Sequence, residues 1–192
     1  MNIFSAGASV TSLTDRTNQQ PKVDRGTMKQ RWKGLGKFIS LFLRLALGVT
    51  FLSAVADRFG FWGTYGHTNV SWGNYARFEG YVGKLNWFLP TTVIPALSII
   101  VTIAETLFGI LLIIGFKTRL TALLSGVLLM SFGLTMTAAL GVKAPLNFSV
   151  FSAAGGALLL ATCDDFRFSL DELLLYVAKR DRQEAGFTDI GR

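Results

Sequence analysis

The stretch from Val93 to Val142 constrains this chain more than any other. Two long apolar runs are joined by the turn Gly115-Phe116-Lys117-Thr118-Arg119. The first run contains one carboxylate, Glu105, and the second, from Leu120 to Val142, contains no charged residue. A helix needs about 20 apolar residues to cross a hydrocarbon core about 30 Å thick, and each run meets that length. The sequence therefore predicts a transmembrane helical hairpin.

The composition of the whole chain favours a membrane protein. Of its 192 residues, 51% are hydrophobic and only 16% are charged, whereas charged residues make up about a quarter of an ordinary soluble domain. The single cysteine, Cys163, excludes an internal disulfide, a Cys-x-x-Cys redox pair and a cysteine-rich metal site. The single histidine, His67, excludes the multi-histidine sites that hold haem or a di-iron centre in a bundle.

The apolar pattern predicts an all-α integral membrane four-helix bundle within residues 35–163, with spans at about 38–56, 93–116, 120–142 and 146–163. Small residues crowd the last span, which favours close helix packing. Residues 1–34 are polar and charged and are expected to form a flexible basic tail without a cleavable signal peptide, with Met28 as an alternative start. Residues 164–192 are expected to form a second tail, in which the capping box Ser169-x-x-Glu172 begins an amphipathic helix.

The longest connection, residues 57–92, is rich in aromatic residues. Ser71 is a candidate cap for a short amphipathic helix that would lie over the end of the bundle. The tryptophans and tyrosines are expected mainly to anchor the loop at the membrane–water boundary. A ligand platform is the alternative, and its candidate lining residues are Trp62, Trp72, Tyr75 and Trp87.

The basic residues predict the orientation of the chain. Four of the nineteen lysines and arginines fall between the first and second spans or between the third and fourth, and one, Arg44, lies inside the first span. The other fourteen precede the first span, follow the last one, or lie in the turn that holds Lys117 and Arg119. The positive-inside rule therefore places both termini and this turn in the cytoplasm of a bacterial inner-membrane protein. The net charge of +7 is explained by topology and anionic lipid, without a nucleic-acid partner.

Two charged residues lie inside the predicted spans. Counting 1.5 Å per residue from Lys37 and Lys117, Arg44 would lie about 10 Å and Glu105 about 18 Å from the cytoplasmic side. A buried carboxylate in a membrane needs a partner, so an intramembrane pair of Arg44 and Glu105 is one hypothesis. Alternatively, Arg44 extends to the interface, and Glu105 exchanges a proton with a bound molecule such as a quinone.

Catalytic and metal-binding motifs are not evident. His67, Glu79 and Asp57 share the outer loop but lack the spacing of metal ligands, so no metal site and no catalytic residue are predicted. Cys163 is interpreted as a small packing residue. No cofactor is expected, with a quinone as the alternative.

Two stretches carry a family resemblance. Residues 43–52, Leu-Arg-Leu-Ala-Leu-Gly-Val-Thr-Phe-Leu, and residues 104–120, with Glu105 followed by Gly109 and the Gly-x-x-Thr-Arg turn, resemble DoxX-like membrane proteins. The resemblance extends over about 38–171 and includes Phe168-Ser169-Leu170-Asp171. Where the family often closes its first helix with Gly-x-x-Lys, this chain has Ala54-Val55-Ala56-Asp57-Arg58, which makes Arg58 the candidate counterpart of that lysine.

The resemblance implies a four-helix membrane bundle. It also implies a role for some relatives as small membrane subunits of thiosulfate:quinone oxidoreductases or of redox-stress complexes. The third span of this chain lacks the histidine of some relatives. We therefore expect a non-catalytic membrane component that anchors or assembles a partner, such as another membrane or redox protein. The alternative is a membrane subunit of a quinone-linked oxidoreductase with its quinone near Glu105.

Overall fold

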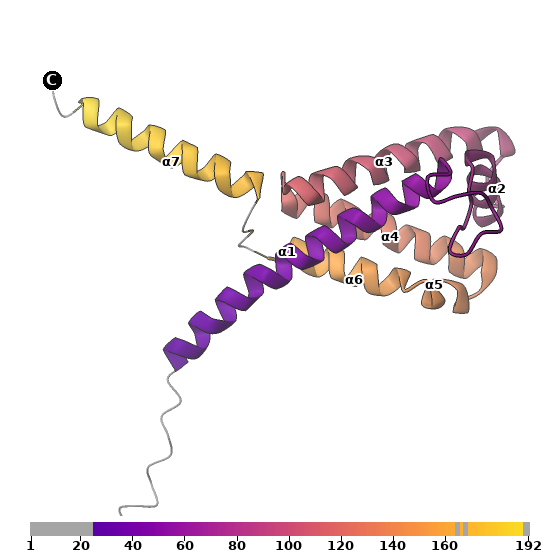
Figure 1. Ribbon diagram of the computed structural model, residues 1–192, viewed down its shortest axis with the longest axis horizontal. Coiled ribbons are helices and arrows are strands. Elements are labelled where there is room, and N and C mark those ends of the chain that lie inside the picture. The colour runs from indigo at the N-terminus through magenta and orange to yellow at the C-terminus, as the bar shows by residue number, and fades with distance from the viewer. Residues whose placement is uncertain (1–24, 164–165, 167–168, 190–192) are drawn as a thin grey trace, which may run out of the picture. The chain divides into compact units, whose positions relative to one another are not determined.

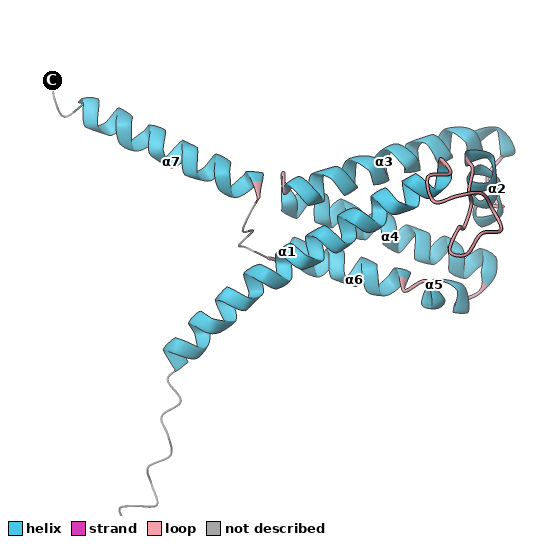
Figure 2. Ribbon diagram, in the orientation of Figure 1, coloured by secondary structure: helices cyan, strands magenta, loops and turns pink. Residues whose placement is uncertain are grey.

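The described part of the chain is helical. The computed structural model describes residues 25–163, 166 and 169–189, and within these ranges it contains α-helices and no strand (Figure 2). The helices are α1 (Arg25–Arg58), α2 (Tyr75–Leu85), α3 (Ile94–Ile114), α4 (Thr118–Leu140), α5 (Lys143–Asn147), α6 (Val150–Ala161) and α7 (Leu170–Asp189), with a 3₁₀ turn, η2 (Thr91–Val93), before α3. The all-α prediction is confirmed. Helix α1 begins inside the segment that was expected to be a flexible tail, whose first 24 residues lie outside the described ranges.

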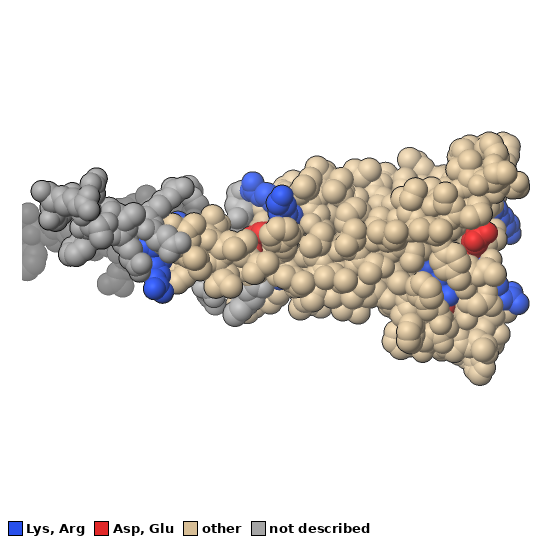
Figure 3. All heavy atoms as spheres, turned by 90° about the horizontal axis from the view of Figure 1, so that it is seen from above, with Lys and Arg blue, Asp and Glu red and all other residues tan. Residues whose placement is uncertain are grey.

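Three helical segments are long and apolar enough to cross a membrane: Gly34–Arg58, Thr91–Ile114 and Thr118–Leu140. The shortest has 23 residues, which corresponds to about 35 Å of helix. The face shown in Figure 3 has a long uncharged stretch, with lysine, arginine and acidic side chains towards its ends. Large apolar side chains such as Ile100 and Leu107 of α3 and Val127 of α4 are exposed, as expected for a surface that contacts lipid.

The fourth predicted span is interrupted. Residues 146–163 do not form one helix, because α5 ends at Asn147 and α6 begins only at Val150. Between them Ser149 has a φ of 53°, a left-handed conformation that stops a right-handed helix. Helix α6 alone has 12 residues, about 18 Å, which is shorter than the hydrocarbon core. The prediction of a continuous helix was wrong here.

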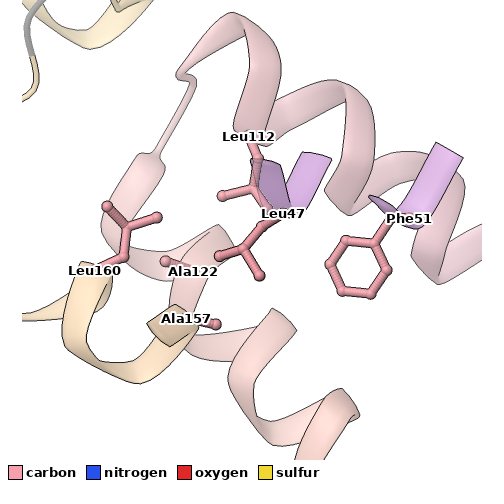
Figure 4. Close-up of a cluster of buried hydrophobic side chains, with 6 residues drawn as sticks. All are labelled: Leu47, Phe51, Leu112, Ala122, Ala157 and Leu160. Atoms are coloured by element: carbon pink, nitrogen blue, oxygen red, sulfur yellow. The ribbon is translucent and has the colours of Figure 1, made fainter. Parts of the chain in front are cut away.

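Helices α1, α3, α4 and α6 meet in one hydrophobic core. Its buried members are Leu47 and Phe51 of α1, Leu112 of α3, Ala122 of α4, and Ala157 and Leu160 of α6 (Figure 4). Helix α6 packs most extensively against α4 and lies alongside it in Figure 1. The short fourth apolar helix is therefore an integral part of the core.

Glycines let neighbouring helices approach closely. A Cβ built on Gly133 of α4 would lie 2.5 Å from the ring of Phe151, and one on Gly126 would lie 2.7 Å from Leu158. Between α1 and α3, a Cβ on Gly48 would lie 2.8 Å from the carbonyl oxygen of Gly109. Membrane helices pack through such small residues, because lipid supplies no hydrophobic driving force for association.

We predict that Gly48→Ala destabilises the protein by about 1–3 kcal/mol, the usual effect of overpacking, because the new methyl group meets backbone and not only a movable side chain. Gly155→Ala is the matched control, since Gly155 is exposed and a Cβ there would have no neighbour within 4 Å. The measurement is the free energy of unfolding in mixed detergent micelles. Equal stability of the two variants would contradict the close approach of α1 and α3.

Helix α2 covers one end of the bundle, as predicted. Its apolar face buries Phe78, Val82 and Leu85, and Phe78 and Val82 pack with Ile94 of α3. The predicted cap was wrong, because the side chain of Asn74, not Ser71, accepts the backbone N–H of Arg77 at 3.0 Å. The segment thus forms the expected amphipathic helix, with its start shifted along the chain.

Helix α7 begins at the predicted capping box. The backbone N–H of Glu172 donates to Ser169 Oγ at 3.1 Å, which confirms the first half of that motif. The apolar side chains of Leu173, Leu174 and Val177 are exposed.

Candidate functional site: two buried charge clusters

Asp57, near the C-terminal end of α1, ties the following loop back onto this helix. Its carboxylate accepts the backbone N–H groups of Ser71, Trp72 and Gly73 at 2.9, 3.2 and 3.3 Å. Asp57 is only 5% exposed, and three donors supply the hydrogen bonds that a buried carboxylate needs. This contact brings Trp72 and the start of α2 over the end of the bundle.

Arg58 is the ionic partner of Glu105. Its Nη2 forms a salt bridge with Glu105 Oε2, and its Nη1 donates to Thr102 Oγ1 at 3.0 Å. The two charged side chains are 2% and 4% exposed. A carboxylate and a guanidinium buried side by side neutralise each other, which makes both compatible with the interior of a membrane protein.

Aromatic rings close this pair from the end of the bundle that α2 covers. The Arg58 guanidinium carbon lies 3.7 Å from the centre of the Phe78 ring and 5.5 Å from that of Trp72, so the cation faces aromatic π-systems. Tyr75 packs against Phe78, and its buried hydroxyl has no hydrogen-bond partner among the described residues. We call Arg58, Trp72, Tyr75, Phe78, Thr102 and Glu105 the outer cluster.

The structure does not bring Arg44 and Glu105 together, which corrects the predicted pair. Arg44 Nη2 donates to the carbonyl oxygen of Ile113 at 3.3 Å, and Ile113 lies eight residues, or about 12 Å, beyond Glu105 along α3. Side chains on a helix lean towards its N-terminus. Arg44 therefore reaches towards the turn between α3 and α4, while Arg58 reaches from the C-terminal end of α1 into the bundle and meets Glu105. The Arg44 side chain points towards the turn end of the bundle, as the alternative hypothesis of an arginine that extends to the interface requires. The side chain is nevertheless buried, with 1% of its surface exposed.

A second cluster surrounds the turn between α3 and α4. The Asp171 carboxylate accepts the backbone N–H groups of Lys117 and Thr118, both at 2.8 Å, and the Thr118 hydroxyl at 2.9 Å. In return, the Asp171 N–H donates to the carbonyl oxygen of Gly115 at 3.1 Å. Arg44 also attracts Asp171 electrostatically. We call Arg44, Gly115, Lys117, Thr118 and Asp171 the turn cluster.

The structure explains the glycine, the threonine and the arginine of the Gly-x-x-Thr-Arg sequence. Gly115 has a φ of 75°, and a Cβ there would lie 2.6 Å from Ser169 Cβ and 2.8 Å from Arg44 Cζ. Thr118 is fully buried and bonded to Asp171. Arg119 Nε donates to the carbonyl oxygen of Cys163 at 2.9 Å, which joins the turn to the residues after α6.

The four aromatic residues predicted to line a ligand site do not share one environment. Trp72 and Tyr75 both contact Phe78 in the outer cluster. Trp62 is 61% exposed and donates from Nε1 to the carbonyl oxygen of Ser53, and Trp87 is 70% exposed and packs edge-on against Phe88. Among the described residues, no three His, Cys, Asp or Glu side chains are grouped as metal ligands would be.

Sequence reasoning missed the roles of Asp57, Thr102 and Asp171. Arg58 was noted only as the counterpart of a family lysine. The sequence feature that could have indicated its role is its position at the end of the first apolar run. Asp171 lay within a quoted motif, but its contact with Thr118 spans 53 residues. Spacing along the chain therefore gave no sign of this contact.

We predict that Asp57→Asn loosens the loop between α1 and α2, because a neutral amide offers one acceptor oxygen in place of the two that now accept three N–H groups. The expected result is faster amide hydrogen exchange at Ser71, Trp72 and Gly73. Exchange in α4 should stay unchanged. Unaltered exchange at the three amides would contradict the role assigned to Asp57.

Long apolar helices with exposed apolar side chains, together with a buried ion pair between α1 and α3, define an integral membrane protein of the helical class. The DoxX family model matches residues 39–139, more than half of the chain, and the chain belongs to the DoxX family. The match contains Arg44, Arg58, Glu105 and the turn, while Asp171 lies outside it. No curated protein and no solved structure matches the chain.

Proposed function

We propose that this chain is a non-catalytic component of a bacterial inner membrane that anchors or assembles a partner complex, such as a membrane or redox protein. The observation that carries this proposal is the closure of the outer cluster. Glu105 of α3 contacts Arg58 of its own chain, and Phe78 and Trp72 cover that arginine. The intramembrane carboxylate thus acts as a lock between α1 and α3.

The proposal includes a topology. Helices α5 and α6 together act as the fourth crossing, since 143–161 covers 19 residues despite the break at Ser149. Both termini and the Lys117/Arg119 turn face the cytoplasm, as the positive-inside rule favours. Helix α7 then lies along the cytoplasmic surface of the bilayer, with Leu173, Leu174 and Val177 towards the lipid.

The experiment is purification of the full chain from its native membranes in a mild detergent, followed by native mass measurement and extraction of bound quinone. We expect an assembly heavier than the chain alone, with far less than stoichiometric quinone. The assembly should persist in Glu105→Gln. A chain that runs alone under these conditions would contradict the assembly role.

The alternative function is a membrane subunit of a quinone-linked oxidoreductase, of the thiosulfate:quinone type. The buried Tyr75 hydroxyl favours it, because it has no hydrogen-bond partner among the described residues and a quinone oxygen could accept from it. The Tyr75 ring packs against Phe78, which also faces Arg58. Stoichiometric quinone that is lost in Glu105→Gln but retained in Glu79→Gln would establish this alternative over the assembly role.

A further inference from the structure

A shallow cavity, widely open to the surface, lies at the turn between α3 and α4, at the opposite end of α3 from α2. Its volume is about 510 Å³, and its lining consists of Lys117, Thr118, Arg119, Leu120, Phe166 and Asp171. These residues supply two positive charges, one negative charge and an apolar wall. The cavity therefore offers two kinds of contact side by side.

The charged side of the cavity is held in place by the turn cluster. Lys117 is exposed, with a left-handed φ of 44° that the hydrogen bond from its N–H to Asp171 supports. Arg119 is oriented by its Nε bond to the Cys163 carbonyl. Asp171 already accepts the first N–H groups of α4, so an incoming anion would meet the cationic side chains and not the end of the helix.

The apolar side of the cavity continues onto the membrane-facing surface. Leu120 is 51% exposed, and Leu123, Leu124 and Val127 extend the exposed apolar surface along α4. Phe166, which also lines the cavity, packs against the hydrophobic core. The boundary between the polar turn and the lipid-facing helix thus passes through the cavity.

We propose that this cavity binds the headgroup of an anionic phospholipid. The phosphodiester lies against Lys117 and Arg119, and an acyl chain runs along Leu120 and the exposed face of α4. Basic pockets beside membrane helices bind anionic headgroups in this way. A free phosphate shares the chemistry of the headgroup but would use only the cationic side. The proposal does not depend on the assembly role.

The test measures the affinity of the full chain, in neutral detergent micelles, for phosphatidylglycerol that carries a fluorescent acyl chain. We expect Lys117→Gln to weaken binding about fivefold, the usual effect of one basic residue at an anionic membrane surface. Lys117→Arg should retain wild-type affinity. The control is Lys143→Gln, which removes an exposed charge at the start of α5 and should leave the affinity unchanged.

Three results would overturn the proposal. Equal weakening in Lys117→Gln and Lys143→Gln would mean that net charge alone attracts the lipid. Equal affinity for phosphatidylcholine would mean that the anionic headgroup is not recognised. Competition by millimolar inorganic phosphate as strong as that by unlabelled phosphatidylglycerol would assign the cavity to a free anion. Thermal unfolding of each variant verifies that the fold is retained.

Discussion

Arg58→Met should destabilise the protein by about 3–5 kcal/mol, because it leaves the Glu105 carboxylate buried without its counter-charge. Glu105→Met should have a similar effect through the unpaired guanidinium. The double variant should recover most of the loss, since replacing both members of a buried ion pair by apolar side chains of similar size is often nearly neutral. The measurement is a double-mutant cycle on the free energy of unfolding in mixed micelles.

The matched control for this cycle pairs Arg44→Met with Glu105→Met. The structure places Arg44 against Ile113 and Gly115, so these two substitutions should act additively within about 0.5 kcal/mol. A large coupling of Glu105 with Arg44, together with additivity between Glu105 and Arg58, would reverse the assignment of the ion pair.

Asp171→Ala should destabilise the turn cluster by about 2–4 kcal/mol. The substitution removes the acceptor for two backbone N–H groups at the start of α4, an effect of about 1 kcal/mol for an ordinary cap. It also leaves the buried Thr118 hydroxyl without its partner, which costs about 1–3 kcal/mol. The measurements are the free energy of unfolding and amide exchange at Lys117 and Thr118.

Two further variants test the same cap. Asp171→Asn keeps one acceptor oxygen and should lose about half as much stability as Asp171→Ala. In Thr118→Val the hydroxyl is absent, so a subsequent Asp171→Ala substitution should have a smaller effect than in the wild type. Independent effects of the two substitutions would show that the carboxylate does not cap α4 through Thr118.

The sequence predicted the structural elements that depend on long apolar runs, on periodic spacing or on local side-chain chemistry. Apolar runs around Glu105 and from Leu120 onward give the α3 and α4 spans, because helix length in a membrane is set by the thickness of the hydrocarbon core. Near-helical spacing gave the buried face of α2, with Phe78, Val82 and Leu85. Local side-chain chemistry gave the start of α7, where the contact from Ser169 to Glu172 joins residues three apart.

The errors arose where a side-chain direction or a single backbone angle decided the structure. The depth estimate counted only the rise along each helix. It ignored that the Arg44 side chain leans towards the N-terminus of α1, so the partner of Glu105 was misassigned. Ser149 has a left-handed φ, but no glycine or proline at that position indicates the break in the sequence. The cap from Asp171 to Thr118 depends on tertiary structure that local spacing does not encode.

The contact of Asp57 with the loop after α1 also bears on how that loop can evolve. The carboxylate accepts only main-chain N–H groups, from Ser71, Trp72 and Gly73. It therefore holds the loop in place through the backbone and does not depend on the side chains of the loop. Homologues can therefore exchange exposed residues such as Phe61, Thr64 and Thr68 while the point of attachment persists. The glycines of this segment are exceptions, because Gly60, Gly63, Gly66 and Gly73 all have a positive φ, and a Cβ on Gly73 would meet the backbone at Tyr65. Natural variation should consequently be wide at the exposed positions and narrow at Asp57 and at these glycines.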